Sequence, residues 1–267
     1  MPWQVFDAEP HDVLDLLHDE RLELLGLLRS LRADDWARPT ECPGWGVREI
    51  AAHLLHDDLR LLAHLRDGYQ GAWFNGPVAD LGPWLHERNQ HFVSGTEDLS
   101  PDVIVDLLDW TASRLDAIYA ARDPLAHDDA VAWAVPDASC PNWLGSGREY
   151  TERLAHQNQI RRAIGTPELD GERWLGPALD IWRWCLPVAL RGVPGSVRIS
   201  TFAPERTWHL SDGDFVDALV APDASVSLPA AALVAAWTAA PEASISEYAI
   251  GGATLIAALG RARAIIV

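Results

Sequence analysis

The stretch "TERLAHQNQIRRAIG", residues 151–165, is built from good helix formers and ends at Gly165, a residue typical of a helix C-terminus. Glu152 and His156 stand four residues apart on this predicted helix, about 40° apart around its axis, on the face that also carries Ile160. A carboxylate on an inward-facing helix face is costly unless it is paired or binds a metal. The pair is therefore either an ordinary (i, i+4) contact or two ligands of a cation.

The rest of the first 168 residues contains three further long helical patterns. Apolar residues at three- and four-residue spacings predict helices over residues 9–31 and 47–66, and a Ser-Pro-Asp start predicts another over residues 100–120. The fourth helix is predicted over residues 148–164. Irregular stretches at 69–83, with room for a short helix at 84–93, and at 122–147 interrupt the pattern, which favours a helix bundle.

Beyond Pro167 the pattern changes. "SVRISTFAPERTWHLSDGDFVDALV" has short alternating runs separated by turn residues, which predict strands, while "SLPAAALVAAWTAA" and "GGATLIAALGRAR" predict helices. The expected fold class is therefore mainly α, with a four-helix bundle over residues 1–168 and a smaller α+β domain over residues 169–267.

Composition limits the classes of partner. The formal net charge is −18, so phosphate backbones and anionic membrane surfaces are expected to be repelled. The chain starts without the basic and apolar segments of a signal peptide, and its three cysteines form no CxxC motif. We therefore expect a cytoplasmic protein, monomer or homodimer, with small-molecule partners and neither nucleic acid nor membrane.

A cation needs a third ligand, and the second helix offers His53, His56 and His64. The apolar stripe of that helix leaves His53 at its edge, beside Asp57. Helical periodicity alone does not choose among these histidines.

Two motifs together resemble the mycothiol-dependent maleylpyruvate isomerase family, which is part of the DinB-like group of metal-binding bundles. "TECPGWGVREIAAHLLHDD", residues 40–58, is similar to a Thr-x-x-x-Gly-Trp loop that leads into a helix carrying a histidine ligand. The matching positions of the first motif are Thr40, Gly44, Trp45 and His53, and those of the second are Glu152, His156, Ile160, Arg161, Arg162, Ala163 and Gly165. Departures from the family pattern are Gln159, where an Asp is usual, and Thr238 and Gly251-Gly252, where an Arg and a Gly-Asp are usual.

The resemblance implies a DinB-like bundle in which His53, Glu152 and His156 bind Zn²⁺. Two imidazoles and one carboxylate also suit Fe²⁺, Mn²⁺ or Ni²⁺. Three protein ligands leave a fourth position open, which the family is implied to use for a thiol, mycothiol. A thiolate held there adds to an electrophilic carbon, giving cis–trans isomerisation after elimination or S-conjugation after release.

Other residues are weaker candidates for the site. Arg161 and Arg162 could hold a carboxylate of the thiol or substrate, or could cap the helix C-terminus. Asp57 could orient His53, and Glu149 could act as a general base. Cys42, which has no partner cysteine in a CxxC motif, is expected to be a small buried residue. The irregular stretches carry aromatic residues that could form a wall for a bulky apolar substrate or could only hold the long loops in place. They are Trp73, Phe74, Trp84, Trp133 and Trp143.

Three other functions compete with the thiol-using enzyme. The first is a metal- or ligand-binding bundle without catalysis. The second is a metal-dependent hydrolase in which the open position activates water, with Glu149 as its base. The third, a zinc protein that regulates transcription, would need redox cysteines near the ligands, and the chain has no CxxC motif.

Overall fold

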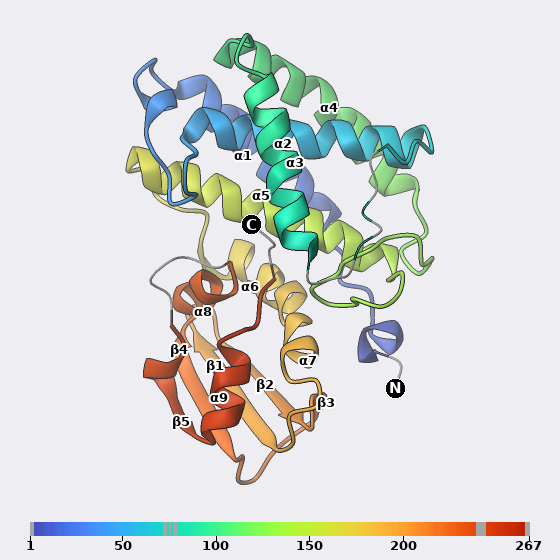
Figure 1. Cartoon of the computed structure of the whole chain (residues 1–267), viewed down its shortest axis with the longest axis vertical. Helices are drawn as coiled ribbons and strands as arrows, with labels where there is room; N and C mark the ends of the chain where they lie inside the picture. Colours follow the sequence, from blue (N-terminus) through green and yellow to red (C-terminus); the bar gives the residue numbers. More distant parts are fainter. Residues whose placement is uncertain (1–2, 72–73, 75, 77–79, 239–243, 265–267) are drawn as a thin grey trace. The chain divides into compact units, whose positions relative to one another are not determined.

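The computed structural model describes residues 3–71, 74, 76, 80–238 and 244–264 (Figure 1). Its contacts divide the chain into two units. We call Asp12–Asp123 with Glu152–Leu169 the bundle unit, and Met1–His11 with Pro124–Thr151 and Asp170–Val267 the sheet unit. The expected domain boundary at residue 168 stays a prediction, because contact units need not fold independently. The grouping of Pro124–Thr151 with the sheet unit differs from the expected bundle range.

The bundle unit is built from long helices. They are α1 (Leu14–Ser30), α2 (Val47–Leu61, continued by a π-helical segment Leu62–Arg66), α3 (Leu81–Gly95), α4 (Pro101–Ala121) and the part of α5 (Asn142–Ile164) from Glu152 onward. Helix α2 packs against α3 and α4, and α4 packs against α1. The predicted four-helix bundle is confirmed, and α3 is longer than the short helix expected at 84–93.

Helix α5 begins six residues before the predicted start at residue 148. The segment Asn142–Gly147 is rich in Gly and follows Pro141, so its sequence indicates an irregular stretch. Trp143 and Leu144 are nevertheless buried in the sheet unit. Tertiary packing therefore outweighs local helix propensity in this segment.

The core of the bundle combines leucines with a buried polar network. Both oxygens of Asp58 on α2 accept hydrogen bonds from Arg21 on α1 at 2.7 Å, and Arg153 on α5 donates to the same carboxylate at 3.0 Å. Thr111 on α4 donates to it as well. All four side chains are buried, so this network joins α1, α2, α4 and α5 at the centre of the unit.

The sheet unit contains a sheet of strand order β3-β2-β1-β4-β5. The strands are β1 (Ser196–Phe202), β2 (Arg206–Ser211), β3 (Asp214–Val216), β4 (Ala224–Pro229) and β5 (Ala249–Gly251), and only β1 and β4 pair in parallel. One face buries Val197, Leu210 and Val226. Helix α8 (Ala230–Trp237) contacts β1 and β4, and helix α9 (Ala253–Leu259) contacts β4. The α+β character predicted for this region is confirmed.

Two details of that region differ from the sequence-based expectation. Helices α6 (Gly171–Trp182) and α7 (Cys185–Ala189) were not predicted. Residues 227–229, expected to begin a helix, instead end β4, where Leu228 is buried on the covered face of the sheet. Within the described residues, none of the helices combines the length and the apolar character needed to cross a bilayer.

Candidate metal centre

The loop before α2 fixes the position of Trp45. The backbone N–H and the hydroxyl of Thr40 both donate to the carbonyl of Trp45, at 3.0 and 2.8 Å. Gly44 has φ = 81°, a left-handed conformation that favours glycine. Gly46 then donates its N–H to the Glu49 carboxylate at 2.9 Å, as in one half of a capping box at the start of α2. The Thr-x-x-x-Gly-Trp pattern is thus a closed turn that leads into the helix carrying His53.

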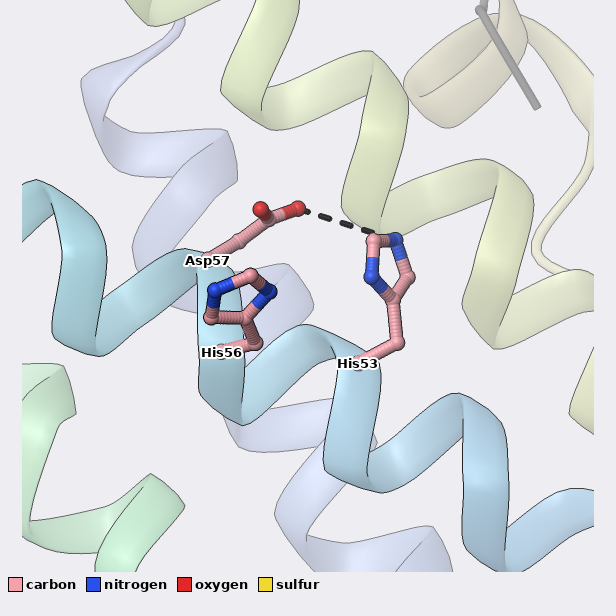
Figure 2. Close-up of side chains that lie close together, drawn as sticks. All are labelled: His53, His56 and Asp57. Atoms are coloured by element: carbon pink, nitrogen blue, oxygen red, sulfur yellow. Dashed lines mark ion pairs between the residues drawn. The ribbon is translucent and has the colours of Figure 1, made fainter. Parts of the chain in front are cut away.

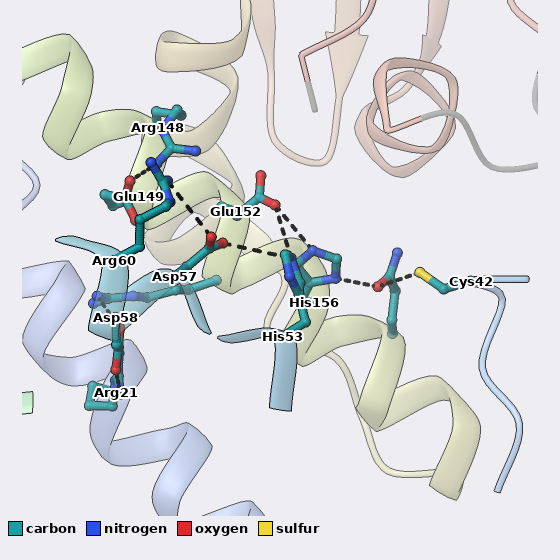
Figure 3. Close-up of polar contacts among 12 residues, drawn as sticks. Arg21, Cys42, His53, Asp57, Asp58, Arg60, Arg148, Glu149, Glu152 and His156 are labelled. Carbon is teal, nitrogen blue, oxygen red and sulfur yellow. Dashed lines mark hydrogen bonds and ion pairs between the residues drawn. The ribbon is translucent and has the colours of Figure 1, made fainter. Parts of the chain in front are cut away.

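Three predicted ligands converge within the bundle unit (Figure 3). Helix α2 supplies His53, and consecutive turns of α5 supply Glu152 and His156. Oε1 of Glu152 lies 3.6 Å from Nε2 of His53 and 3.2 Å from Nε2 of His156. The two imidazole rings meet edge to face, with centroids 4.8 Å apart. Both histidines are buried, so two helices present three donor atoms at one point of the core.

The donor spacing fits a small divalent cation. Zinc bonds of about 2.0–2.2 Å at tetrahedral angles place neighbouring donor atoms roughly 3.4 Å apart. The two separations from Oε1 of Glu152 to the ring nitrogens, 3.2 and 3.6 Å, lie on either side of that value. In the residues that the structure describes, Nδ1 of His53 has no hydrogen-bond partner although it is buried. The donor set is therefore compatible with a cation.

Gln159 orients His156. Nδ1 of His156 lies 2.7 Å from Oε1 of Gln159, and because an amide oxygen only accepts, this contact places the ring proton on Nδ1. Nε2, on the side of Glu152, is then the nitrogen that a metal would bind in place of a proton. The thiol of Cys42 donates to the same amide oxygen at 3.2 Å. Cys42 is thus a buried residue that supports the ring of His156 indirectly.

Without a cation the pKa of His156 lies well above its usual value. Burial alone would lower this pKa, but hydrogen bonds with Cys42 and Glu152 and the negative charge of Glu152 together outweigh burial. Such a ring favours a positive partner at Nε2. The local field at this point is therefore suited to a proton or to a cation.

Asp57 and Glu149 have different surroundings. Asp57 lies one turn after His53 on α2, with its Oδ2 3.7 Å from Nε2 of His53 and its Oδ1 3.8 Å from Arg60. It therefore faces the same nitrogen that Glu152 approaches. Glu149 on α5 is buried and its carboxylate is engaged by Arg148 (Figure 3).

Both arginines at the end of α5 are occupied by ion pairs and hydrogen bonds. Arg161 donates to Glu23 at 3.0 Å and to the carbonyl of Pro167 at 3.1 Å. Arg162 is held by Glu41 and Glu168. These contacts favour a structural role for both side chains, since each guanidinium already has acidic partners.

The described aromatic candidates are divided between the two units. Trp45 lies against His53, with ring centroids 5.2 Å apart, and its indole N–H donates to Gln90. Phe74 and Trp84 contact each other at 5.4 Å, whereas Trp133 and Trp143 are buried in the sheet unit. Trp73 lies outside the described residues. The hydroxyl of Thr238 donates to the carbonyl of Val234 within α8 and its final turn.

Sequence reasoning did not assign a role to Gln159. It stands three residues after His156, which places both on one face of α5. That spacing was the available signal for a residue that holds the ring. In the sequence, Gln159 stands out only as a departure from the family pattern.

The fold and this donor set define a class: helical bundles that present two imidazoles and one carboxylate at one point, with a small α+β unit in the same chain. Within that class, the chain belongs to the mycothiol maleylpyruvate isomerase family. Its residues 17–161, more than half of the chain, match the family's N-terminal domain, described as "Mycothiol maleylpyruvate isomerase N-terminal domain". The resemblance stated from the two motifs is thereby confirmed.

Solved structures agree with this family. The chain is similar to the crystal structures of the mycothiol-dependent maleylpyruvate isomerase and of its mutant with one histidine replaced by alanine. In both cases the identity is 13%, the TM-score is 0.56, and the match covers 91% of this chain and 95% of the other. At this identity the likeness shows the fold. No curated protein matches the chain.

Proposed function

We propose that this protein is a zinc-dependent enzyme that uses a low-molecular-weight thiol, mycothiol, and acts as an isomerase or an S-transferase on a small electrophile. The observation that carries the proposal is the convergence of Nε2 of His53, Nε2 of His156 and Oε1 of Glu152. Family membership supports the choice of thiol, because the family and the matching structures are named for mycothiol.

Each side chain would have a distinct task. His53, Glu152 and His156 would bind the cation, and Gln159 would keep the ring proton of His156 on Nδ1. Trp45, packed against the ring of His53, would limit rotation of that ring and shield it from water. A bound divalent cation supplies Lewis-acid chemistry, lowering the pKa of a coordinated thiol so that the thiolate forms at neutral pH.

The net reaction depends on the fate of the adduct that forms when the thiol sulfur adds to an unsaturated carbon. Addition turns the carbon–carbon double bond into a single bond. Rotation about this carbon–carbon bond, followed by elimination of the thiol, returns an isomerised substrate. Release of the adduct gives an S-conjugate instead. Both outcomes use the same donor set, so we propose the coarser activity, addition of a thiol to an electrophile, as the common step.

Compartment and assembly are part of the proposal. All three cysteines, Cys42, Cys140 and Cys185, are free and buried. Free thiols at these positions support a reducing compartment, the cytoplasm. We propose a monomer or homodimer acting on small molecules.

The test is a thiol-addition assay with purified protein, mycothiol and a set of electrophilic substrates, including maleylpyruvate. We expect a rate that is lost in the Glu152→Ala/His156→Ala variant and after chelation, and restored to the chelated wild type by Zn²⁺. A folded double variant with the wild-type rate would contradict the proposal. Turnover of an ester or amide in the absence of any thiol would point to hydrolysis instead.

A further inference from the structure

A second group of possible cation ligands lies on α2 alone. His53, His56 and Asp57 stand at positions i, i+3 and i+4, so they share one face of the helix. One ligand atom from each lies within 4.8 Å of the other two. Figure 2 shows the two imidazole rings beside each other, with the carboxylate of Asp57 next to them. This group shares His53 with the candidate metal centre and uses neither Glu152 nor His156.

Within the described part of the chain, each histidine of this group has one ring nitrogen that makes no hydrogen bond. The side chains of His53 and His56 are buried, with exposed fractions of 3% and 8% for the residues. Nδ1 of each ring is buried and has no hydrogen-bond partner within the described part of the chain. A buried nitrogen without a hydrogen-bond partner destabilises the folded chain, so two such atoms on one helix face indicate a missing ligand.

Stacking on an aromatic ring fixes the position of the His56 side chain. The imidazole packs against Phe92 of α3, with ring centroids 4.4 Å apart and planes within 13°. This contact holds the ring close to His53 and Asp57 and supplies no hydrogen-bond partner for its Nδ1.

We propose that His53, His56 and Asp57 form a second divalent-cation site, which overlaps the first at His53 and is filled in place of it. Two imidazoles and one carboxylate suit Zn²⁺, Co²⁺ or Ni²⁺. The inference rests on the proposed function only in that the first site competes for the cation.

The two sites exclude each other because they share one ring. A neutral imidazole has a proton on one nitrogen and a lone pair on the other, so His53 can bind one cation at a time. The α2 site is also the weaker one. Arg60 lies 3.8 Å from Asp57 and competes with a cation for that carboxylate. A cation is therefore expected to rest on the α2 site only when Glu152 and His156 do not hold it.

The test is a titration of the metal-stripped, full-length protein with Co²⁺, followed by calorimetry and by visible absorbance. The variant Glu152→Gln/His156→Gln removes the first site, and adding His56→Phe removes the second while keeping an aromatic ring on Phe92. The matched control adds His91→Asn, in place of His56→Phe, to the double variant, because His91 is an exposed histidine on α3. Circular dichroism establishes that each variant is folded.

We expect the wild type to bind about one Co²⁺ per chain, and the double variant to bind about one with at least tenfold weaker affinity. The triple variant with His56→Phe is expected to lose this binding, whereas the control with His91→Asn keeps it. A folded double variant that binds no Co²⁺ would overturn the second site. A triple variant that binds as well as the double would do the same, and two Co²⁺ per wild-type chain would overturn the exclusion.

A separate variant distinguishes failure of the second site from failure of the proposed function. The single variant His56→Phe, in the wild-type background, is expected to bind Co²⁺ with unchanged affinity at the first site. If that variant bound none, the α2 group would be the protein's cation site, and the zinc-thiol proposal based on Glu152 and His156 would be contradicted.

Discussion

At the scale of single residues, the most informative contact is the one between Gln159 and His156. An amide oxygen at 2.7 Å from Nδ1 selects one tautomer of the ring and aims Nε2 at Glu152. The family usually has an Asp at this position, and either residue type supplies an acceptor. Gln159 therefore supplies the acceptor without placing a negative charge beside the candidate metal centre.

Replacing Gln159 by Leu is expected to weaken cation binding about 10- to 100-fold, because the ring of His156 loses the acceptor that orients it. Gln159→Glu retains an acceptor and is the control, with affinity expected within a few-fold of the wild type. Both are measured by competition with a chromogenic chelator. Equal affinities for the wild type and the Leu variant would show that Gln159 does not position the ligand.

His56 predicts how stability changes with pH in the metal-free protein. Its pKa is about 4 in the folded chain, against an ordinary value of 6.5, mainly because burial disfavours the charged ring. Between these values the imidazole of residue 56 is protonated in the unfolded chain and not in the folded chain, so the contribution of His56 to stability falls as pH falls from 6.5 towards 4. The expected loss at pH 5, relative to pH 7.5, is about 1–2 kcal/mol.

Urea unfolding at the two pH values in the presence of a chelator measures this difference. The His56→Phe variant is the comparison, and its loss between pH 7.5 and pH 5 is expected to be smaller by that amount. If the variant and the wild type lost the same free energy of unfolding, His56 would not be the neutral buried group described.

At the scale of helices, the bundle is held by the carboxylate of Asp58 as well as by leucines. Arg21, Arg153 and Thr111 all bind Asp58 from other helices, and the whole group is buried. Removing Asp58 takes the shared counter-charge from the two buried guanidinium groups of Arg21 and Arg153. The network therefore requires α1, α2, α4 and α5 to keep one mutual register.

Asp58→Ala is expected to lower the free energy of unfolding by about 3–5 kcal/mol, because two buried guanidinium groups lose their counter-charge. The matched control is Asp109→Ala, which breaks an exposed ion pair with Arg29 in the same bundle and is expected to cost at most about 1 kcal/mol. Chemical denaturation of both variants gives the comparison. Similar values for the two would mean that the buried network contributes little.

The elements also show how much of the fold could be predicted from sequence. The Ser-Pro-Asp start predicted α4 to within one residue at each end, because this signal is local. The leucine spacing predicted the existence of α1 but placed its start five residues too early. Ser100 indeed accepts a hydrogen bond from the N–H of Val103. The start of α5 and the strand β4 could not be placed correctly, because burial against distant segments decides them.

The candidate site could also be predicted only in part, where a local motif marked it. Motif resemblance selected His53 among the histidines of α2, whereas periodicity left it at the edge of the apolar stripe. The structure buries His53 and His56 alike, together with Asp57 and Asp58. Three other helices supply the neighbours: Glu152 of α5 lies beside His53, Phe92 of α3 against His56 and Thr111 of α4 against Asp58. A helical wheel describes one helix and contains no partner, so it could not show this burial or the role of Gln159.

At the scale of the whole molecule, residues 124–151 matter for how the chain can be divided. They belong to the sheet unit, where Tyr150 donates to the carbonyl of Trp174 at 2.8 Å and Trp143 meets Trp184 edge to face. Gly147 lies against Ile181, with no space for a larger side chain. A cut after residue 168 would expose these buried surfaces.

A fragment of residues 1–168 is therefore expected to aggregate or to unfold without a sharp transition. A fragment of residues 1–190 keeps α6 and α7, and with them Trp174, Ile181 and Trp184, so it is expected to be the more soluble of the two. Size-exclusion chromatography and thermal unfolding compare them. A monomeric, cooperatively unfolding 1–168 fragment would contradict this expectation and support an independent bundle domain.

The central claim is that His53, Glu152 and His156 bind a divalent metal. Elemental analysis of the purified protein, beside the Glu152→Ala/His156→Ala variant, tests it most directly. We predict about one zinc per wild-type chain, with the tightly bound metal lost from the variant after dialysis against a weak chelator. Absence of metal from the wild type, even after reconstitution with Zn²⁺, would contradict the claim and leave the three side chains as an ordinary buried cluster.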